Sequence, residues 1–550
     1  MTRRQWSWGA VLLAFGLTWL VAYPIVISGL EGFRGPEGWT LDWVRAFLAR
    51  PNEWQALWGS LWISVATVVA AAVVGVPLAF LFARTEFPGR RALGALVGLP
   101  VALPPLVGVL AFLFLYGESG FAAHLVKWIT GSEEAPWRLQ GAGAILLVHA
   151  YSMYVYFYLL VRAALERMDG AAIEAAASLG ASRWRILTRV TLPMLRPSLT
   201  GAALLTFTTS LASFSAPYIF GGGFRVMTTQ VLATRLNGDT QVAMVETVAL
   251  TLIALAALAL MGADPGETGR GGGKGTAPAR HQATGVGRLA AMIGGWTLAI
   301  LLLLPHATLL LLSFVPVGTW TVEAIPPAYT IGNYAALLGD AERLRPLVNS
   351  LWMATLATVA ALAIAVWAAH LVVRRRAPGR RLIEVLLVTP WAVPGTVFAL
   401  ALATAFSVDR PWALRTIMVG TLWILPLAYL IRNLPVTSRP IFAGFRQLDP
   451  SLEEAAAGLG ATRGTILRRV TLPLLAPALA AAGALAFVTA LGDFVTSILL
   501  YTYDTRPLSL EILASLRSGD VGVASVYGVL LMLASAAVFL LGSRSESTTR

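Results

Sequence analysis

Apolar residues occur along this chain in long, nearly unbroken blocks that are separated by shorter polar segments. A helix rises about 1.5 Å per residue, so about 20 apolar residues are needed to cross a hydrocarbon layer of about 30 Å. Blocks of this length predict twelve membrane-spanning helices. Six fall in the first half, at residues 9–30, 59–83, 92–116, 141–161, 199–220 and 242–261, and six in the second, at residues 289–313, 350–373, 383–407, 412–431, 478–500 and 521–541.

The composition agrees with a chain that lies in lipid. Hydrophobic residues make up 57% of the 550 residues and charged residues 13%, about half of the charged share of about 25% in soluble proteins. The net charge of +13 could suggest nucleic acid, but the basic residues lie beside apolar blocks, where they orient a membrane protein. The absence of cysteine excludes disulfides, thiolate metal sites and thiol nucleophiles. We therefore predict an all-α integral membrane protein whose partner is the lipid bilayer and not nucleic acid.

The distribution of basic residues predicts which side of the membrane each loop faces. Arg3 and Arg4 precede the first apolar block, which at about 20 residues is longer than a typical cleavable signal core, so we interpret it as a retained span. With a cytoplasmic N-terminus, the inside segments hold 28 of the 41 Lys and Arg residues. This bias follows the positive-inside rule and places both termini in the cytoplasm.

The chain contains two copies of one plan. The Pro-Gly-Arg-Arg sequence at 88–91 recurs at 378–381, and the segment 174–199 matches 454–479 with 18 of 26 positions identical. Because each copy has an even number of spans, both enter the membrane from the same side, and the repeat is parallel.

The repeat predicts two membrane domains, 1–261 and 289–550, joined by 262–288. The joining segment has a glycine-rich run that resembles a phosphate-binding loop. Thr268 and Gly275, however, occupy the places where such a loop needs glycine and Ser or Thr. We interpret 262–288 as a flexible cytoplasmic linker.

Two duplicated cytoplasmic segments have unusual contents for connections between spans. Each has an acidic, alanine-rich stretch, at 169–177 and 449–457, followed by a glycine and then a basic stretch that leads to Thr-Leu-Pro. Alanine and glutamate favour helix, while glycine permits a sharp turn. The segments therefore predict a helix, a turn and a second short helix. Pro193 and Pro473 fit the first turn of the following membrane helix, where a missing N–H is tolerated.

These segments resemble the cytoplasmic motif of the permeases of binding-protein-dependent ABC importers. The motif residues are Glu174, Ala175, Ala176, Gly180, Val190, Leu192 and Pro193, and again Glu454, Ala455, Ala456, Gly460, Val470, Leu472 and Pro473. Both copies have valine where isoleucine is usual. The resemblance implies the type I ABC importer permease fold, with two parallel six-helix repeats in a bacterial inner membrane. It also implies that the short helix of each segment docks on one of two copies of a cytoplasmic ABC ATPase, where its glutamate pairs with a basic residue.

The same resemblance implies how work is divided among the subunits. The ATPase partner binds ATP and Mg, whereas this chain is a translocation subunit and not an enzyme, so we expect no catalytic residue, cofactor or metal site in it. A periplasmic or extracellular substrate-binding protein delivers the substrate. Closing of the two ATPases around ATP then moves the two halves from inward-open to outward-open.

Charged residues inside membrane spans are rare and tend to be functional. Asp493 lies about 15 residues into the eleventh predicted span, and its counterpart at an offset of 280 is Ser213. Both are candidate residues of the substrate pathway. The alternative is that Asp493 is a buried carboxylate satisfied by its neighbours. Glu246, near the outer end of the sixth span, is expected to reach interfacial water.

The substrate is predicted from the arrangement of the chain. Two six-span halves fused in one polypeptide look like the importers for ferric iron, with thiamine, polyamine and phosphonate permeases as similar relatives. Ferric iron is therefore the expected substrate. An ion-coupled secondary transporter is the alternative from another class, but it needs ionisable relays within the membrane, which are scarce here, and has no need of two docking segments. A membrane enzyme is disfavoured because no nucleophile, base and metal converge in the sequence.

Overall fold

The computed structural model describes residues 8–98, 100, 104–262, 281–282, 285–320, 323 and 325–547, and these residues are mostly helical. The first half contains α1 (Trp8–Leu17), α2 (Tyr23–Glu31), α3 (Asp42–Ala49), α4 (Pro51–Arg84), α5 (Arg90–Gly98), α6 (Pro105–Tyr116), α7 (Phe121–Thr130), α8 (Gly141–Arg167), α9 (Ala171–Ser178), α10 (Arg183–Ile186), α11 (Leu192–Leu211), α12 (Ser215–Phe220), α13 (Met227–Leu236) and α14 (Thr240–Gly262). The second half contains α15 (Gly285–Leu312), α16 (Gly332–Leu338), α17 (Ala341–Ala369), α18 (Arg380–Ala392), α19 (Gly395–Ala405), α20 (Ile424–Gln447), α21 (Pro450–Gly458), α22 (Arg463–Ile466), α23 (Leu472–Leu491), α24 (Ser497–Leu500), α25 (Leu508–Arg517) and α26 (Val521–Ser547).

The strands in the described residues are only two residues long. β1 (Arg34–Gly35) pairs antiparallel with β2 (Gly38–Trp39) in a hairpin. β3 (Thr85–Glu86) pairs in parallel with β4 (His281–Gln282), just before α15 begins. Most of the predicted linker, residues 263–280 and 283–284, lies outside the described residues, so the domain boundaries stay a prediction.

Nine helical segments within the described residues are long and apolar enough to cross a membrane, and the bent pair α18 and α19 makes a tenth. Two more helices, α11 with 20 residues and α20 with 24, are also long enough but contain more polar side chains. Together these elements account for the twelve predicted spans, and the all-α membrane fold is confirmed.

The prediction for the tenth span, 412–431, is wrong at its start. Leu414 and Arg415 have φ of 53° and 55°, and Gly420 has φ of 85°, so a right-handed helix cannot pass through this apolar stretch. The helix α20 begins at Ile424 and continues to Gln447. Arg432, which sequence alone places at the start of a cytoplasmic segment, therefore lies within a membrane helix.

Several spans are broken near the middle of the molecule. α18 and α19 meet at 113°, and Pro394 directly precedes α19, where its missing N–H and its restriction of the preceding residue end α18. The eleventh span ends α23 at Leu491 and resumes as α24 at Ser497, and the fifth is divided in the same way between α11 and α12.

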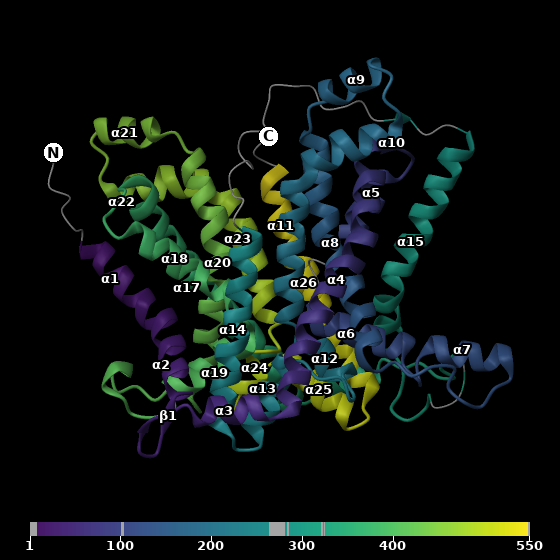
Figure 1. The fold of residues 1–550 in the computed structure, drawn as a ribbon, viewed down its shortest axis with the longest axis horizontal. Coiled ribbons are helices and arrows are strands. Elements are labelled where there is room, and N and C mark those ends of the chain that lie inside the picture. Colours follow the sequence, from purple (N-terminus) through teal and green to yellow (C-terminus); the bar gives the residue numbers. More distant parts are fainter. Residues whose placement is uncertain are drawn as a thin grey trace.

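The first helices of each half pack against the opposite half. α1 and α2 contact α18 and α19, while α15 contacts α5 and α6. In Figure 1, α1 accordingly lies at the left beside α18, and α15 lies at the right beside α5. This exchange joins the halves into one helical body, as expected for two parallel copies related by a twofold axis along the membrane normal.

Matching hydrogen bonds show that the two halves have the same internal plan. The Ser60 hydroxyl accepts a bond from the Met227 N–H at 2.7 Å, and Ser350 accepts one from the Leu508 N–H at 2.7 Å. Ser350 is the repeat of Ser60, and Leu508 is the repeat of Met227. Each bond satisfies a helix N-terminus with a side chain of the second span in its own half.

The two halves meet at aromatic side chains that are equivalent in the repeat. Phe214 and Phe494, which differ by 280 in number, are both buried, with ring centres 5.8 Å apart. Tyr218 stacks on Phe214 at 5.1 Å and meets Phe494 edge to face at 6.1 Å. Gly492 packs so closely on Pro104 that a Cβ atom would lie 2.6 Å from the Pro104 Cβ. The breaks in the fifth and eleventh spans therefore meet between the halves.

Candidate functional site

The predicted helix, turn and short helix are present in both duplicated segments. We call residues 169–193 the first elbow and residues 449–473 the second elbow. In the first elbow α9 ends at Ser178 and Leu179 caps it; Gly180 then turns the chain with φ of 77°, and the Ala181 N–H donates to the Ala176 carbonyl at 3.0 Å. In the second, Gly460 has φ of 83°, and the Ala461 N–H donates to the Ala456 carbonyl at 3.0 Å. This is a Schellman turn, which needs a residue without a side chain in the left-handed region.

Side-chain caps fix where the helices of each elbow begin. Asp169 accepts the Ala171 N–H at 3.0 Å, and Asp449 accepts the Ser451 N–H at 2.9 Å. After the turn, Ser182 caps α10 and Thr462 caps α22. The backbone hydrogen bond from Ser451 lowers the pKa of the Asp449 carboxyl, so the cap is ionised at neutral pH.

Each elbow continues into a membrane helix without a break. A π-helical turn at Leu187–Thr191 joins α10 to α11, and a second at Leu467–Thr471 joins α22 to α23. Pro193 and Pro473 lie in the first turns of α11 and α23, as predicted. The wide turns accommodate these prolines within a continuous helical path. Each elbow is thereby joined by a continuous helical path to the membrane helix that ends shortly before Phe214 or Phe494.

The elbows present an acidic and an apolar side chain to the outside of the molecule. Glu174 and Glu454 are exposed, and within the described residues neither forms an ion pair. Leu179 is 88% exposed and Leu459 90% exposed, immediately before the turn glycines. Trp184 of the first elbow is 72% exposed. Within the described residues these side chains are left uncovered by the rest of the chain, so they are accessible to a partner.

The elbows lie on one side of the molecule. Figure 1 shows α9 and α10 at the upper right and α21 and α22 at the upper left, on the side where α1 begins and α26 ends. The opposite side holds α3, α7, α13 and α25. Sequence reasoning found the motif residues but missed Leu179, Leu459 and Trp184, whose exposure depends on how the elbow projects from the membrane helices.

Asp493 is held by a network at the break between α23 and α24. Its carboxylate accepts the Thr496 N–H and hydroxyl, both at 2.8 Å, and the Ser497 N–H at 3.2 Å. Arg432 of α20 pairs with it at 3.5 Å. These neighbours satisfy the buried carboxylate, and Phe494 beside it forms the contact between the halves.

Ser213, the counterpart of Asp493, belongs to a network of hydroxyl groups around one imidazole ring. The Ser213 hydroxyl lies 2.9 Å from Nε2 of His149, while Nδ1 of the same ring lies 3.2 Å from the hydroxyls of Thr67 and Ser210. The two halves therefore differ next to the central aromatic contact: a charged pair in the second half replaces hydroxyl and imidazole groups in the first. The pathway role of Ser213 and Asp493 stays a prediction.

Glu246 does not reach interfacial water, contrary to the prediction. It is fully buried, and Thr234 donates to it at 2.6 Å. Gln230 donates to both Thr234, at 3.3 Å, and the buried Glu53, at 3.0 Å. The packing of α13 over α4 and α14 covers this position, and sequence position within a span does not reveal such cover.

Other features give no chemical centre in the described part of the chain. No three His, Asp or Glu side chains there are grouped as ligands for a metal ion.

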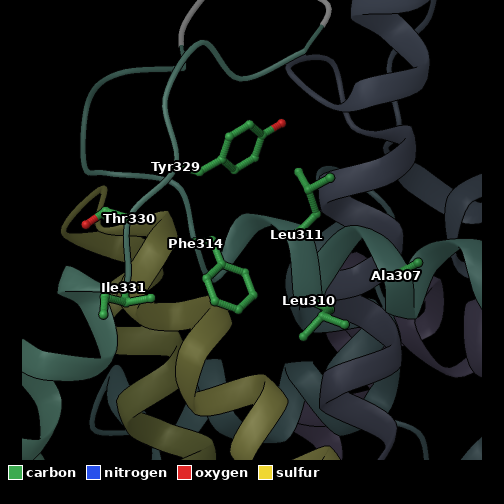
Figure 2. A pocket seen from close by; sticks show the side chains of 7 residues that line it. All are labelled: Ala307, Leu310, Leu311, Phe314, Tyr329, Thr330 and Ile331. Carbon is green, nitrogen blue, oxygen red and sulfur yellow. The ribbon is translucent and has the colours of Figure 1, made fainter.

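The pocket in Figure 2, about 610 Å³, lies at the end of α15 and is lined almost wholly by apolar groups. Its lining residues are Ala307, Leu310, Leu311, Phe314, Tyr329, Thr330 and Ile331. Such a lining suits acyl chains better than a polar solute.

Comparison with known proteins agrees with the duplicated plan. The family described as binding-protein-dependent transport system inner membrane component matches twice, at residues 75–263 and 361–549. A probable ABC transporter permease protein of Sinorhizobium fredii is 31% identical over 498 residues, covering 89% of this chain and 87% of that protein. The ferric transport system permease protein FbpB of Actinobacillus pleuropneumoniae is 27% identical over 547 residues, covering 96% of this chain and 76% of that one.

Other similar proteins cover less of the chain. The molybdenum transport system permease protein ModB of Escherichia coli is 36% identical over 172 residues, or 30% of this chain and 72% of that protein. A solved bacterial ABC transporter involved in import of the polysaccharide alginate matches 47% of this chain and 95% of that one, with 19% identity and a TM-score of 0.39. Since the family matches in both halves and the full-length relatives are permeases, this chain belongs to the binding-protein-dependent ABC importer permeases, as a fused pair of type I permease halves.

Proposed function

We propose that this permease imports its substrate with the power of a separate cytoplasmic ABC ATPase, two copies of which dock on the two elbows. The elbow side of the molecule then faces the cytoplasm, together with both termini. ATP and Mg are bound by the ATPase, and this chain binds no cofactor of its own. The bacterial inner membrane is the proposed location.

The duplicated, exposed elbow is the observation that carries this proposal. Two copies of one rigid turn each present a carboxylate and a leucine, at Glu174 with Leu179 and at Glu454 with Leu459. A basic residue of the partner can pair with each carboxylate, and an apolar pocket can cover each leucine. The unbroken helices α11 and α23 run from the elbows to the central Phe214–Phe494 contact. Closing of two ATPases would move these helices and separate or join the halves.

Charge reversal on both elbows tests the docking. The double variant Glu174→Arg with Glu454→Arg is expected to insert and fold normally but to lose ATPase association and uptake, because two repulsive contacts replace two attractive ones. The control is Glu133→Arg with Glu134→Arg, which reverses two exposed charges in the loop after α7 on the opposite side. Normal association and uptake in the elbow variant would contradict the docking role.

We propose ferric iron as the substrate, delivered by an external substrate-binding protein. The relatives named as ferric transport permeases cover 90% to 96% of this chain, whereas the molybdenum permease of Escherichia coli covers 30%. The whole two-half arrangement thus matches the ferric permeases. Uptake of radioactive iron into proteoliposomes that contain the permease, its ATPase and its binding protein tests this, with thiamine, a polyamine, a phosphonate and molybdate as competitors. The assignment would be rejected if one of these competitors abolished the uptake of radioactive iron while excess unlabelled ferric iron did not.

An ion-coupled carrier remains the alternative mechanism, and the same vesicles separate it from the proposal. A carrier moves substrate when a proton or sodium gradient is imposed without ATP. The proposed importer requires ATP and the ATPase and gives no uptake from an ion gradient alone.

A further inference from the structure

The two elbows are attached differently to the membrane helices beneath them. Glu453 of α21 accepts a hydrogen bond from the Thr471 hydroxyl at 2.8 Å. Arg374, at the end of the second span of this half, pairs with the same carboxylate at 3.3 Å. We call Arg374, Glu453 and Thr471 the elbow bridge. It ties the docking helix both to the helical segment that extends α17 and to the base of α23.

Arg374 is itself held firmly. Its side chain is 11% exposed, it donates to the Leu448 carbonyl at 3.0 Å, and its guanidinium lies 5.8 Å from the centre of the Phe445 ring. The partner carboxylate of Glu453 is 22% exposed. A charge pair with this little solvent and several fixed partners restricts orientation more than an exposed pair does.

The first elbow lacks the acidic member of this bridge. Ile173 occupies the place of Glu453 and packs against apolar neighbours. The other two members are kept, since Arg84 is the repeat of Arg374 and Thr191 is the repeat of Thr471. Arg84 donates to the sulfur of Met168 at 3.5 Å, and Met168 is the repeat of Leu448, so its guanidinium reaches the equivalent place.

We propose that Glu453 is a positioning residue that fixes the second docking helix to the membrane helices, so that the two ATPases act on elbows of unequal rigidity. This inference rests on the proposed docking function. Glu453 lies on the half-buried face of the docking helix, whereas Glu454 beside it is exposed. Glu453 therefore affects how movement is transmitted, and Glu454 affects whether the ATPase binds.

Hydrogen exchange of the purified permease tests the bridge directly. Glu453→Ile copies the residue of the first elbow and is expected to speed exchange of the α21 amides about fivefold. Glu453→Gln keeps an acceptor for Thr471 and should have a smaller effect. Ile173→Glu supplies the missing carboxylate beside Arg84 and should slow exchange in α9. Unchanged exchange of α21 in Glu453→Ile would overturn the proposal.

A matched control removes a similar but exposed pair. Glu384 and Arg446 lie 3.8 Å apart with 39% and 64% of their side chains exposed, and exposed pairs contribute little to structure. Glu384→Ile should leave exchange of α21 unchanged. If it speeds α21 exchange as much as Glu453→Ile does, the effect is general loosening and the bridge has no special role.

The effect of Glu453→Ile on transport distinguishes a positioning role of the elbow bridge from a role in ATPase docking. In proteoliposomes, Glu453→Ile is expected to lower the amount of substrate moved per ATP about threefold while the Kd for the ATPase changes less than about twofold. An unchanged transport ratio would overturn the positioning role. A failure of docking itself would appear instead as unchanged ATPase binding in the Glu174→Arg and Glu454→Arg variant, and the exchange measurement does not depend on that result.

Discussion

Replacement of the two exposed leucines should weaken ATPase binding by an amount that follows from their exposure. Leu179 and Leu459 are 88% and 90% exposed in the free permease, so docking can bury nearly the whole side chain. Leucine to alanine removes three carbon atoms, each contributing about 0.8 kcal/mol on burial, or about 2.4 kcal/mol per elbow. This corresponds to an increase of about 60-fold in the Kd of each ATPase.

The assay is binding of labelled ATPase to the permease in lipid nanodiscs, measured for Leu179→Ala, Leu459→Ala and the double variant. Because these side chains are exposed, the melting temperature of the permease alone should not fall. Leu236→Ala is the matched control, since Leu236 is 75% exposed at the end of α13 on the opposite side. A double variant that binds with the wild-type Kd would refute burial of these leucines by the ATPase.

Three further variants test other parts of the account. Gly180→Ala with Gly460→Ala places side chains at φ of 77° and 83°, which should destabilise each turn by about 1 kcal/mol or more and increase hydrogen exchange in the elbows; unchanged exchange would contradict this view of the turn. Gly492→Ala puts a Cβ 2.6 Å from the Pro104 Cβ, so overpacking between the halves should lower stability by about 1 to 3 kcal/mol in thermal unfolding; wild-type stability would show that the contact yields easily. Asp493→Asn removes the partner of Arg432 and should lower both stability and uptake, and uptake and binding-protein-stimulated ATP hydrolysis at wild-type levels would remove Asp493 from the pathway.

The spans and the elbows could be predicted because their signals are local. A block of about 20 apolar residues is sufficient to require a membrane helix. In the elbows, Asp449 caps the helix, Gly460 ends it and Pro473 fits the next helix, all within 25 residues. Each of these residues acts through its own backbone or a neighbour a few positions away, so no knowledge of the tertiary fold is needed.

The remaining features depend on contacts between residues that are distant in sequence. Arg432 could be placed beside Asp493 only once α20 was known to begin at Ile424. The left-handed Leu414 and Arg415 prevent a continuous helix through the apolar stretch before it, and the apolar sequence gives no sign of this. The elbow bridge was likewise hidden, because the helices α18, α19 and α20 lie between Arg374 and Glu453 in the sequence. Burial of Glu246 depends on α13, which folds over it from the preceding segment.

Transport by the reconstituted system tests the central claim most directly. Proteoliposomes containing the permease, with its ATPase on the elbow side and its binding protein on the other, should accumulate substrate when ATP is supplied. They should fail to do so when Glu174 and Glu454 are both changed to arginine. Accumulation by the permease alone, driven by an ion gradient without ATPase or ATP, would contradict the account.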